Sequence, residues 1–305
     1  MVNLFKNLSK FVRLHGLLLA GVLLSLVLAC SSQKPDNGHV FRMPISNEPP
    51  TLDWSLATDS VSFGILTNIM EGLTQYDSNM NPVSAIAERW EISNSGKTIT
   101  YYLRDNVFWT DGIPVTAHDF EYSWKRLLNP ATAAQYAYFL FDIVNAYEYN
   151  SGKISDASKI GVYAKSARIL EVHLKKPAVY FPSITTFMVT FPQRKDIVEK
   201  FGDHWTDPAN IVTKGPFKLS HWKHEYKLTL TANETFYEGR PALNTIIAYV
   251  VKEKTPALTL YETGELEMVE LPPVAIPHFK GHKEYKNLPQ LRGYYYGINV
   301  LKYPF

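Results

Sequence analysis

The sequence predicts a mixed α/β (α+β) protein, and three observations support this class. Stretches that alternate apolar with polar residues, as strands do, are interspersed with stretches at helical spacing, without strict alternation of the two. The chain has 305 residues, enough for one large domain or two ordinary ones. Its 46% hydrophobic, 13% aromatic and 20% charged residues indicate a globular core, which excludes a disordered, collagen-like or coiled-coil chain.

Strands are predicted where the side chains alternate and turn residues stand beside them. Around Ile99–Leu103, apolar residues alternate with Thr98, Thr100 and Tyr102, and Asn94–Lys97 supplies the preceding turn. Further strands are expected at Val40–Ile45, Ile169–Leu174, Phe217–Trp222, Lys227–Thr231, Thr245–Val251, Met268–Val269 and Tyr294–Val300.

Helices are predicted where apolar residues recur every three or four positions. The stretch Ser60–Tyr76 shows such a stripe. Thr116, three residues before Asp119, predicts a capped helix that continues to Leu128 and is stopped by Pro130. Further helices are expected at Tyr136–Tyr149, which is rich in aromatic residues, and at Thr255–Thr263.

The beginning of the chain carries an export signal. Lys6, Lys10 and Arg13 precede the uncharged run Leu17–Ala29. These thirteen residues are too few for a helix that crosses a bilayer, which takes about 20. The pattern therefore predicts a secretory signal peptide over residues 1–29.

The next residues resemble a bacterial lipobox. Val27–Cys30 has an apolar residue, then a small residue directly before the cysteine, and a polar segment follows. The resemblance implies that Cys30 is diacylated, and residues 30–39 then form a lipidated tether. Two acyl chains give stable attachment, so we expect the protein on the outer face of the cytoplasmic membrane, in the periplasm or at the cell surface. The alternative is an ordinary secreted protein with an incidental cysteine.

Charge and cysteine content exclude several partners and cofactors. Without the first 29 residues, 28 basic residues stand against 29 acidic ones, so no positive excess remains to attract nucleic acid. Cys30 is the single cysteine, which excludes an intrachain disulfide and a cysteine zinc cluster. We expect no nucleic-acid partner.

Enzyme motifs are mostly missing from the sequence. It contains no GxSxG, HExxH, GxxxxGK or strand-linked GxGxxG motif. Ser220 and Lys223 match SxxK, but they fall in a predicted strand, which sends positions three apart to opposite faces. His278 and His282 have the spacing of two metal ligands without a third, so surface histidines are the favoured interpretation. We expect no enzyme and no cofactor.

Several long motifs are similar to those of a known family. They are Pro82–Glu91, Gly96–Gly112, Pro114–Phe120, Pro130–Tyr136, Lys200–Trp205, Pro208–Val212, Lys214–Phe217 and Tyr295–Asn299. From about Val40 to Phe305 the chain resembles the family 5 extracellular solute-binding proteins of ABC importers, most closely the oligopeptide-binding OppA type.

The resemblance implies a clamshell of the periplasmic-binding-protein type II class with an inserted domain. Residues 40–72 would form the first part of lobe one, 73–192 the inserted domain, 193–291 the remainder of lobe one and 292–305 the start of the second lobe. Family members are much longer, so we expect the second lobe to be largely missing and this 305-residue form to bind peptides weakly or not at all.

The resemblance also implies a function and a site. The protein would capture oligopeptides and deliver them to the permease subunits of an ABC importer. By position, Thr58, Asp59 and Ser60 match the stretch of lobe one that pairs with the ligand backbone. Tyr136 matches an aromatic residue that reaches the cleft from the inserted domain, and Tyr295 matches one on the strand entering lobe two. Core packing is an equal alternative for each tyrosine.

Other functions stay open at this point. Relatives of this fold also resemble receptors for nickel, haem or sugars, although the motifs at 130–136 and 200–212 favour peptides. A truncated remnant that acts as a surface interaction protein without a transport function is an alternative from another class. An enzyme is a further one, which hydrolysis of added peptides would reveal.

Overall fold

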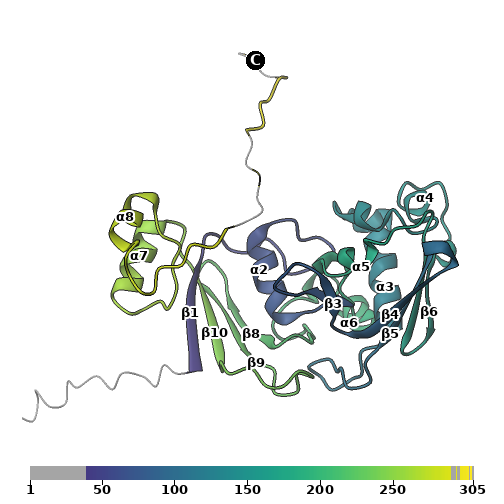
Figure 1. Ribbon diagram of the computed structural model, residues 1–305, viewed down its shortest axis with the longest axis horizontal. Helices are drawn as coiled ribbons and strands as arrows, with labels where there is room; N and C mark the ends of the chain where they lie inside the picture. The colour runs from purple at the N-terminus through teal and green to yellow at the C-terminus, as the bar shows by residue number, and fades with distance from the viewer. Residues whose placement is uncertain (1–38, 290–292, 294–295, 302, 304–305) are drawn as a thin grey trace, which may run out of the picture.

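The computed structural model describes residues 39–289, 293, 296–301 and 303, and it shows a mixed α/β protein built on two four-stranded sheets. In Figure 1 the first sheet lies between the pair α7–α8 and helix α2, and the second sheet lies with α3 on the side away from α7 and α8. The fold class predicted from the sequence is therefore confirmed.

The first sheet joins the start of the described chain to a much later part of it. Its strand order is β1 (Val40–Ile45), β10 (Thr245–Val250), β9 (Lys227–Ala232), β8 (Phe217–Lys223). β1 runs parallel to β10, and the other neighbours are antiparallel. Alternate residues of β9 are buried, as its sequence pattern predicts. The four predicted strands in this sheet are confirmed.

The second sheet is antiparallel throughout. Its order is β4 (Ala87–Ser93), β5 (Thr98–Leu103), β7 (Ile169–His173), β6 (Val162–Ser166). The predicted turn before β5 is a short 3-10 turn, Asn94–Gly96, in which Gly96 has a φ of 84°. A small hairpin pairs β2 (Thr74–Tyr76) with β3 (Pro82–Ser84).

Helix α3 (Ala117–Leu128) covers the second sheet, packing on β6 and β7. The predicted capping box is present: the Thr116 amide and hydroxyl both donate to the Asp119 carboxylate, at 2.8 and 3.1 Å. The buried face of the helix recurs at helical spacing, with Phe120, Trp124 and Leu127 fully buried. The remaining α-helices of the described residues are α2 (Ser60–Ile69), α4 (Ala146–Asn150), α5 (Phe181–Ile184), α6 (Lys195–Phe201), α7 (Lys254–Glu262) and α8 (Ile276–Phe279).

The helix predicted over Ser60–Tyr76 is too long. α2 ends at Ile69, and Met70 is already extended, with a φ of −138°. The cause is a close approach: a Cβ on Gly72 would lie 2.2 Å from the carbonyl oxygen of Thr185. Residues Thr74–Tyr76 instead pair with β3.

The continuous helix predicted over Tyr136–Tyr149 is wrong. The structure has a 3-10 helix at Ala137–Leu140 and the short α4. Between them Ile143 forms an isolated bridge with Leu174, and Asn145 has a φ of 62°. Pairing with Leu174, directly after the end of β7, therefore overrides the local helical preference of this stretch.

The structure shows no strand at two further places where the sequence predicts one, as far as the residues there are described. Met268–Val269 is not a strand; its neighbour Glu267 donates one backbone hydrogen bond to Arg42 of β1, at 2.9 Å. For the strand predicted at Tyr294–Val300, Tyr294 and Tyr295 lie outside the described residues. Residues 296–300, which are described, are not in a strand.

Large aromatic side chains fill the core. The largest fully buried ones are Trp54, Trp109, Trp124, Tyr101, Phe120 and Phe181. They belong to one cluster that also includes apolar residues of both four-stranded sheets. The high aromatic content of the sequence is thus used in part for packing. Within the described residues, none of the helices has the length and apolar character needed to cross a membrane.

Candidate functional site

The segment Thr58–Ser60 lies at the surface, immediately before α2. Thr58 and Ser60 are exposed, and Asp59 is partly buried. The Asp59 carboxylate caps α2, accepting hydrogen bonds from the amides of Val61 and Ser62, at 3.0 and 2.9 Å. The Asp59 side chain is thus used by the fold itself, and the backbone carbonyl oxygen of Asp59 accepts the amide of Phe63, at 3.2 Å, whereas Thr58 and Ser60 on either side are exposed to solvent.

Tyr136 reaches this segment from a part of the chain 78 residues away. Its hydroxyl donates a hydrogen bond to the carbonyl oxygen of Thr58, at 3.3 Å. The ring of Tyr136 is packed by Phe63, Phe139 and Phe187, with centroid distances of 6.3, 5.6 and 5.8 Å. Tyr136 is therefore partly buried in an aromatic cluster, while its polar end contacts the exposed segment.

The structure thus brings four of the predicted site residues together. Thr58, Asp59 and Ser60 are consecutive, and Tyr136 bonds to the first of them. Tyr295 lies outside the described residues. Tyr138, which is 53% exposed and 5.9 Å from the Tyr136 ring, extends the aromatic cluster to the surface and was not predicted.

A buried carboxylate holds the turn that leads to Thr58. Asp53 is 5% exposed and accepts two hydrogen bonds from Arg126, at 3.0 and 2.6 Å. The Trp205 indole and the Gln193 amide also donate to it, at 3.2 and 3.4 Å, as does the backbone amide of Ser55, at 2.9 Å. The side-chain partners Arg126, Gln193 and Trp205 are far from Asp53 in sequence, which explains why sequence reasoning did not find this network.

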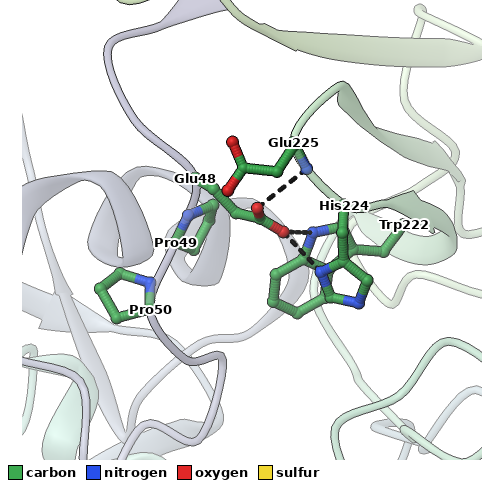
Figure 2. A pocket seen from close by; sticks show the side chains of 6 residues that line it. All are labelled: Glu48, Pro49, Pro50, Trp222, His224 and Glu225. Atoms are coloured by element: carbon green, nitrogen blue, oxygen red, sulfur yellow. Dashed lines mark hydrogen bonds and ion pairs between the residues drawn. The ribbon is translucent and has the colours of Figure 1, made fainter.

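A second carboxylate, that of Glu48, attaches the chain between β1 and this turn to the first sheet. Figure 2 shows the side chain of Glu48 directed toward Trp222 and His224. Glu48 lines a small pocket of about 350 Å³ together with the turn between β8 and β9. Glu48 accepts hydrogen bonds from the Trp222 indole at 2.8 Å, the His224 ring at 2.5 Å and the Glu225 amide at 2.9 Å. Partial burial raises the pKa of Glu48, but these hydrogen bonds outweigh it and hold the pKa below its usual value.

The end of α2 lies beside Lys214, a buried residue that forms an ionisable pair with the partly buried Glu71. The amides of Lys214 and Gly215 both donate to the carbonyl oxygen of Ile69, at 3.2 and 2.8 Å. A Cβ on Gly215 would lie 2.5 Å from the Ile69 carbonyl carbon, so only glycine fits there. The Lys214 side chain is fully buried, and no hydrogen-bond partner for its ammonium group occurs among the described residues.

Burial shifts both groups of this pair toward their neutral forms. It lowers the pKa of Lys214 to about 7, although the nearby Glu71 carboxylate opposes the shift. It also raises the pKa of Glu71, which the Lys214 charge opposes in turn. Sequence reasoning assigned Lys214 only to a family motif, and no local pattern marks it as buried.

The residues considered as catalytic or metal-binding candidates make contacts within the fold. The Ser220 hydroxyl donates to the carbonyl oxygen of Thr229, at 3.0 Å. His282 lies 3.9 Å from the Glu284 carboxylate, and His278 packs against Phe279. Across the described part of the chain, no three His, Cys, Asp or Glu side chains are grouped so as to hold a metal ion.

Comparison with known proteins identifies the family. The profile described as "Bacterial extracellular solute-binding proteins, family 5 Middle" matches residues 81–305. The chain therefore belongs to family 5 of the bacterial extracellular solute-binding proteins.

Individual relatives agree with this assignment. The chain is 34% identical to the dipeptide-binding protein DppE of Bacillus subtilis, over 85% of this chain and 48% of DppE. It is 33% identical to the periplasmic oligopeptide-binding protein OppA of Salmonella typhimurium, over 98% of this chain and 57% of OppA. The crystal structure of an oligopeptide ABC transporter substrate-binding domain from Bacillus anthracis matches 80% of this chain and 47% of that one, with a TM-score of 0.76 and 34% identity.

These matches confirm the predicted fold family, a periplasmic-binding-protein type II fold of the OppA type. The chain spans about half the length of the curated relatives that it matches.

Proposed function

We propose that this chain is part of an extracytoplasmic peptide-binding protein that serves an ABC importer and is anchored to the membrane through a lipid on Cys30. The observation that carries the proposal is the surface segment Thr58–Ser60, in which the hydrogen bond from Tyr136 orients the carbonyl of Thr58. The names of DppE and of OppA, which describe dipeptide and oligopeptide binding, support peptides as the ligand class.

The mechanism is recognition through main-chain hydrogen bonds. An extended peptide pairs with the backbone of residues 58–60 as an added strand does, so its affinity depends little on its side chains. The Asp59 side chain is occupied by the α2 cap and takes no part in these contacts. The exposed Tyr138 offers an apolar face beside the segment for a ligand side chain.

In the proposed division of the molecule, residues 40–72 and 193–291 form lobe one and 73–192 form an inserted domain. The strand composition of the two sheets supports this division, because β1 and β8–β10 form one sheet and β4–β7 form the other. A second lobe would supply the opposite wall of the cleft and close over the ligand by hinge motion. Since the chain spans about half of its relatives, we expect weak peptide binding by the 305-residue form.

The test is an NMR titration of the isotope-labelled chain with a mixture of tri- to pentapeptides, which detects weak binding and locates it. We expect amide shifts at residues 58–62 and none at the distant strand β10. Tyr136→Phe should weaken these shifts, and Tyr138→Phe should leave the backbone contacts intact. Localised shifts with nickel, haem or a sugar but none with peptides would refute the peptide assignment, and peptide hydrolysis would refute a pure binding role.

A further inference from the structure

The turn before the candidate site depends on a single residue in two ways. The carboxylate of Asp53 accepts hydrogen bonds from Arg126, Gln193 and Trp205, and its backbone carbonyl accepts the amides of Leu56 and Ala57, at 2.9 and 2.8 Å. The side chain thus attaches the turn to the rest of the fold, and the main chain closes the turn itself.

We propose that Asp53 is a positioning residue for ligand binding: it holds the turn 53–57 so that the backbone of residues 58–60 is presented in one conformation. This inference rests on the proposed function, because it assumes that this backbone pairs with the ligand. Asp53 itself is 5% exposed and does not reach the surface segment.

The partners of Asp53 come from separate parts of the fold. Arg126 lies near the end of α3, which packs on the second sheet, whereas Gln193 and Trp205 lie on either side of α6. Arg126 is 73 residues from Asp53, and Trp205 is 152 residues from it. One carboxylate therefore links the start of the candidate site to two other regions of the chain.

The hydrogen bonds to Asp53 make its connection to the rest of the fold rigid. A buried carboxylate is tolerated when charged and hydrogen-bonded partners satisfy both of its oxygens, and the two-pronged contact with a guanidinium fixes orientation as well as charge. Gln193 adds a bridge, since its amide also donates to the Ser55 hydroxyl at 3.0 Å. A turn held in this way is ordered before the ligand arrives, so less conformational entropy is lost on binding.

The experiment measures amide hydrogen exchange, without ligand, in the whole parent chain and in three variants of it. Asp53→Asn removes the charge with little change of shape, and Arg126→Lys keeps the charge but loses the two-pronged geometry. The matched control is Glu267→Gln, which disrupts the pair between Arg42 of β1 and Glu267, also a two-pronged contact, from Arg42 Nε to Oε2 at 3.2 Å and from Nη2 to Oε1 at 2.7 Å. The reporters are the amides of Leu56 and Ala57, and the amides of β5 serve as the internal reference.

We expect Asp53→Asn to accelerate exchange at Leu56 and Ala57 at least tenfold over any change in β5, Arg126→Lys to do so to a smaller extent, and Glu267→Gln to leave both amides unchanged. Equal acceleration of the turn and of β5, or no acceleration, would overturn the proposal. Where Asp53→Asn does not fold, Gln193→Ala removes one bond to Asp53 and one to Ser55, and it should produce the same local effect.

Peptide affinity is then measured on the same proteins. A weaker affinity in Asp53→Asn, with Glu267→Gln like the parent chain, supports the positioning role. An unchanged affinity together with a loosened turn overturns it. If the parent chain itself shows no peptide shifts at residues 58–62, the proposed pairing of peptides with this backbone in the 305-residue form fails, whereas the exchange result still decides whether Asp53 holds the turn.

Discussion

The hydroxyl of Tyr136 donates a hydrogen bond to the backbone carbonyl of Thr58, across 78 residues of sequence and 3.3 Å of space. This contact joins the turn before α2 to the loop that follows α3. Since the Tyr136 ring is packed among Phe63, Phe139 and Phe187, the hydroxyl has little freedom to move away. The carbonyl of Thr58 is therefore oriented by a residue whose own position is set by aromatic packing.

Loss of the α2 cap should destabilise the protein measurably. Asp59→Ala removes the acceptor for the amides of Val61 and Ser62, which costs about 1 kcal/mol of unfolding free energy. Asp59→Asn keeps a capping oxygen and should cost much less. Urea denaturation of both variants measures the difference, and equal stability of the Ala and Asn variants would contradict this account of the cap.

The buried Lys214 should make stability rise with pH above neutrality. Its pKa is lowered from 10.5 to about 7 in the folded state, so between these values the unfolded chain binds more protons than the folded one. The unfolding free energy should therefore increase from about pH 7 to pH 9.5, a range below the ordinary tyrosine titration.

The raised pKa of Glu71 acts in the opposite sense. Above the usual 4.5 the folded state retains a proton that the unfolded chain has lost, so this group makes stability fall as pH rises from that value. The double variant Glu71→Gln with Lys214→Met should flatten both trends, as measured by urea denaturation from pH 4 to pH 9.5. An unchanged slope above pH 7 would show that Lys214 does not titrate in this range.

Glu48 should contribute stability that is lost in acid. Its folded pKa lies below the usual 4.5, so its contribution is present above that value and disappears as pH falls through the folded pKa. Glu48→Gln should reduce the loss of stability between pH 5 and pH 3. Glu234→Gln, which alters an exposed ion pair with Arg240, is the matched control and should leave the acid slope close to that of the parent chain. The same slope for both variants would contradict a specific role of Glu48.

Cys30→Ser should release the protein from the membrane, because it removes the only thiol that can carry the lipid. Fractionation of the native host measures this, and persistence of the variant in the membrane fraction would refute the lipid anchor. The intact mass of the membrane-extracted parent protein gives an independent check: it should include a diacylglyceryl group and begin at residue 30.

Local patterns in the sequence were sufficient for much of the fold. The alternation in β9 and the capping box of Thr116 and Asp119 depend on neighbours within a few residues, and both are present in the structure. The helix predicted over Tyr136–Tyr149 failed because Ile143 pairs with Leu174, a contact between residues far apart in sequence. The predicted end of α2 failed for a similar reason, the close approach of Gly72 to Thr185.

The same contrast between local patterns and contacts of distant residues applies to the candidate site. The residues Thr58, Asp59, Ser60 and Tyr136 were named from family resemblance, and their roles in ligand binding stay predictions. Asp53 was not named, because its charge partner Arg126 is 73 residues away and neither side chain carries a local signal of burial.

By itself the sequence determined the family, most strands and the capped start of α3, since these depend on residue order over short distances or on long matching motifs. Only the tertiary structure decided which charges are buried together, which carbonyl the Tyr136 hydroxyl meets and where two predicted helices stop. Those outcomes depend on desolvation and packing between segments that are distant in the chain, and no short window of sequence contains both partners.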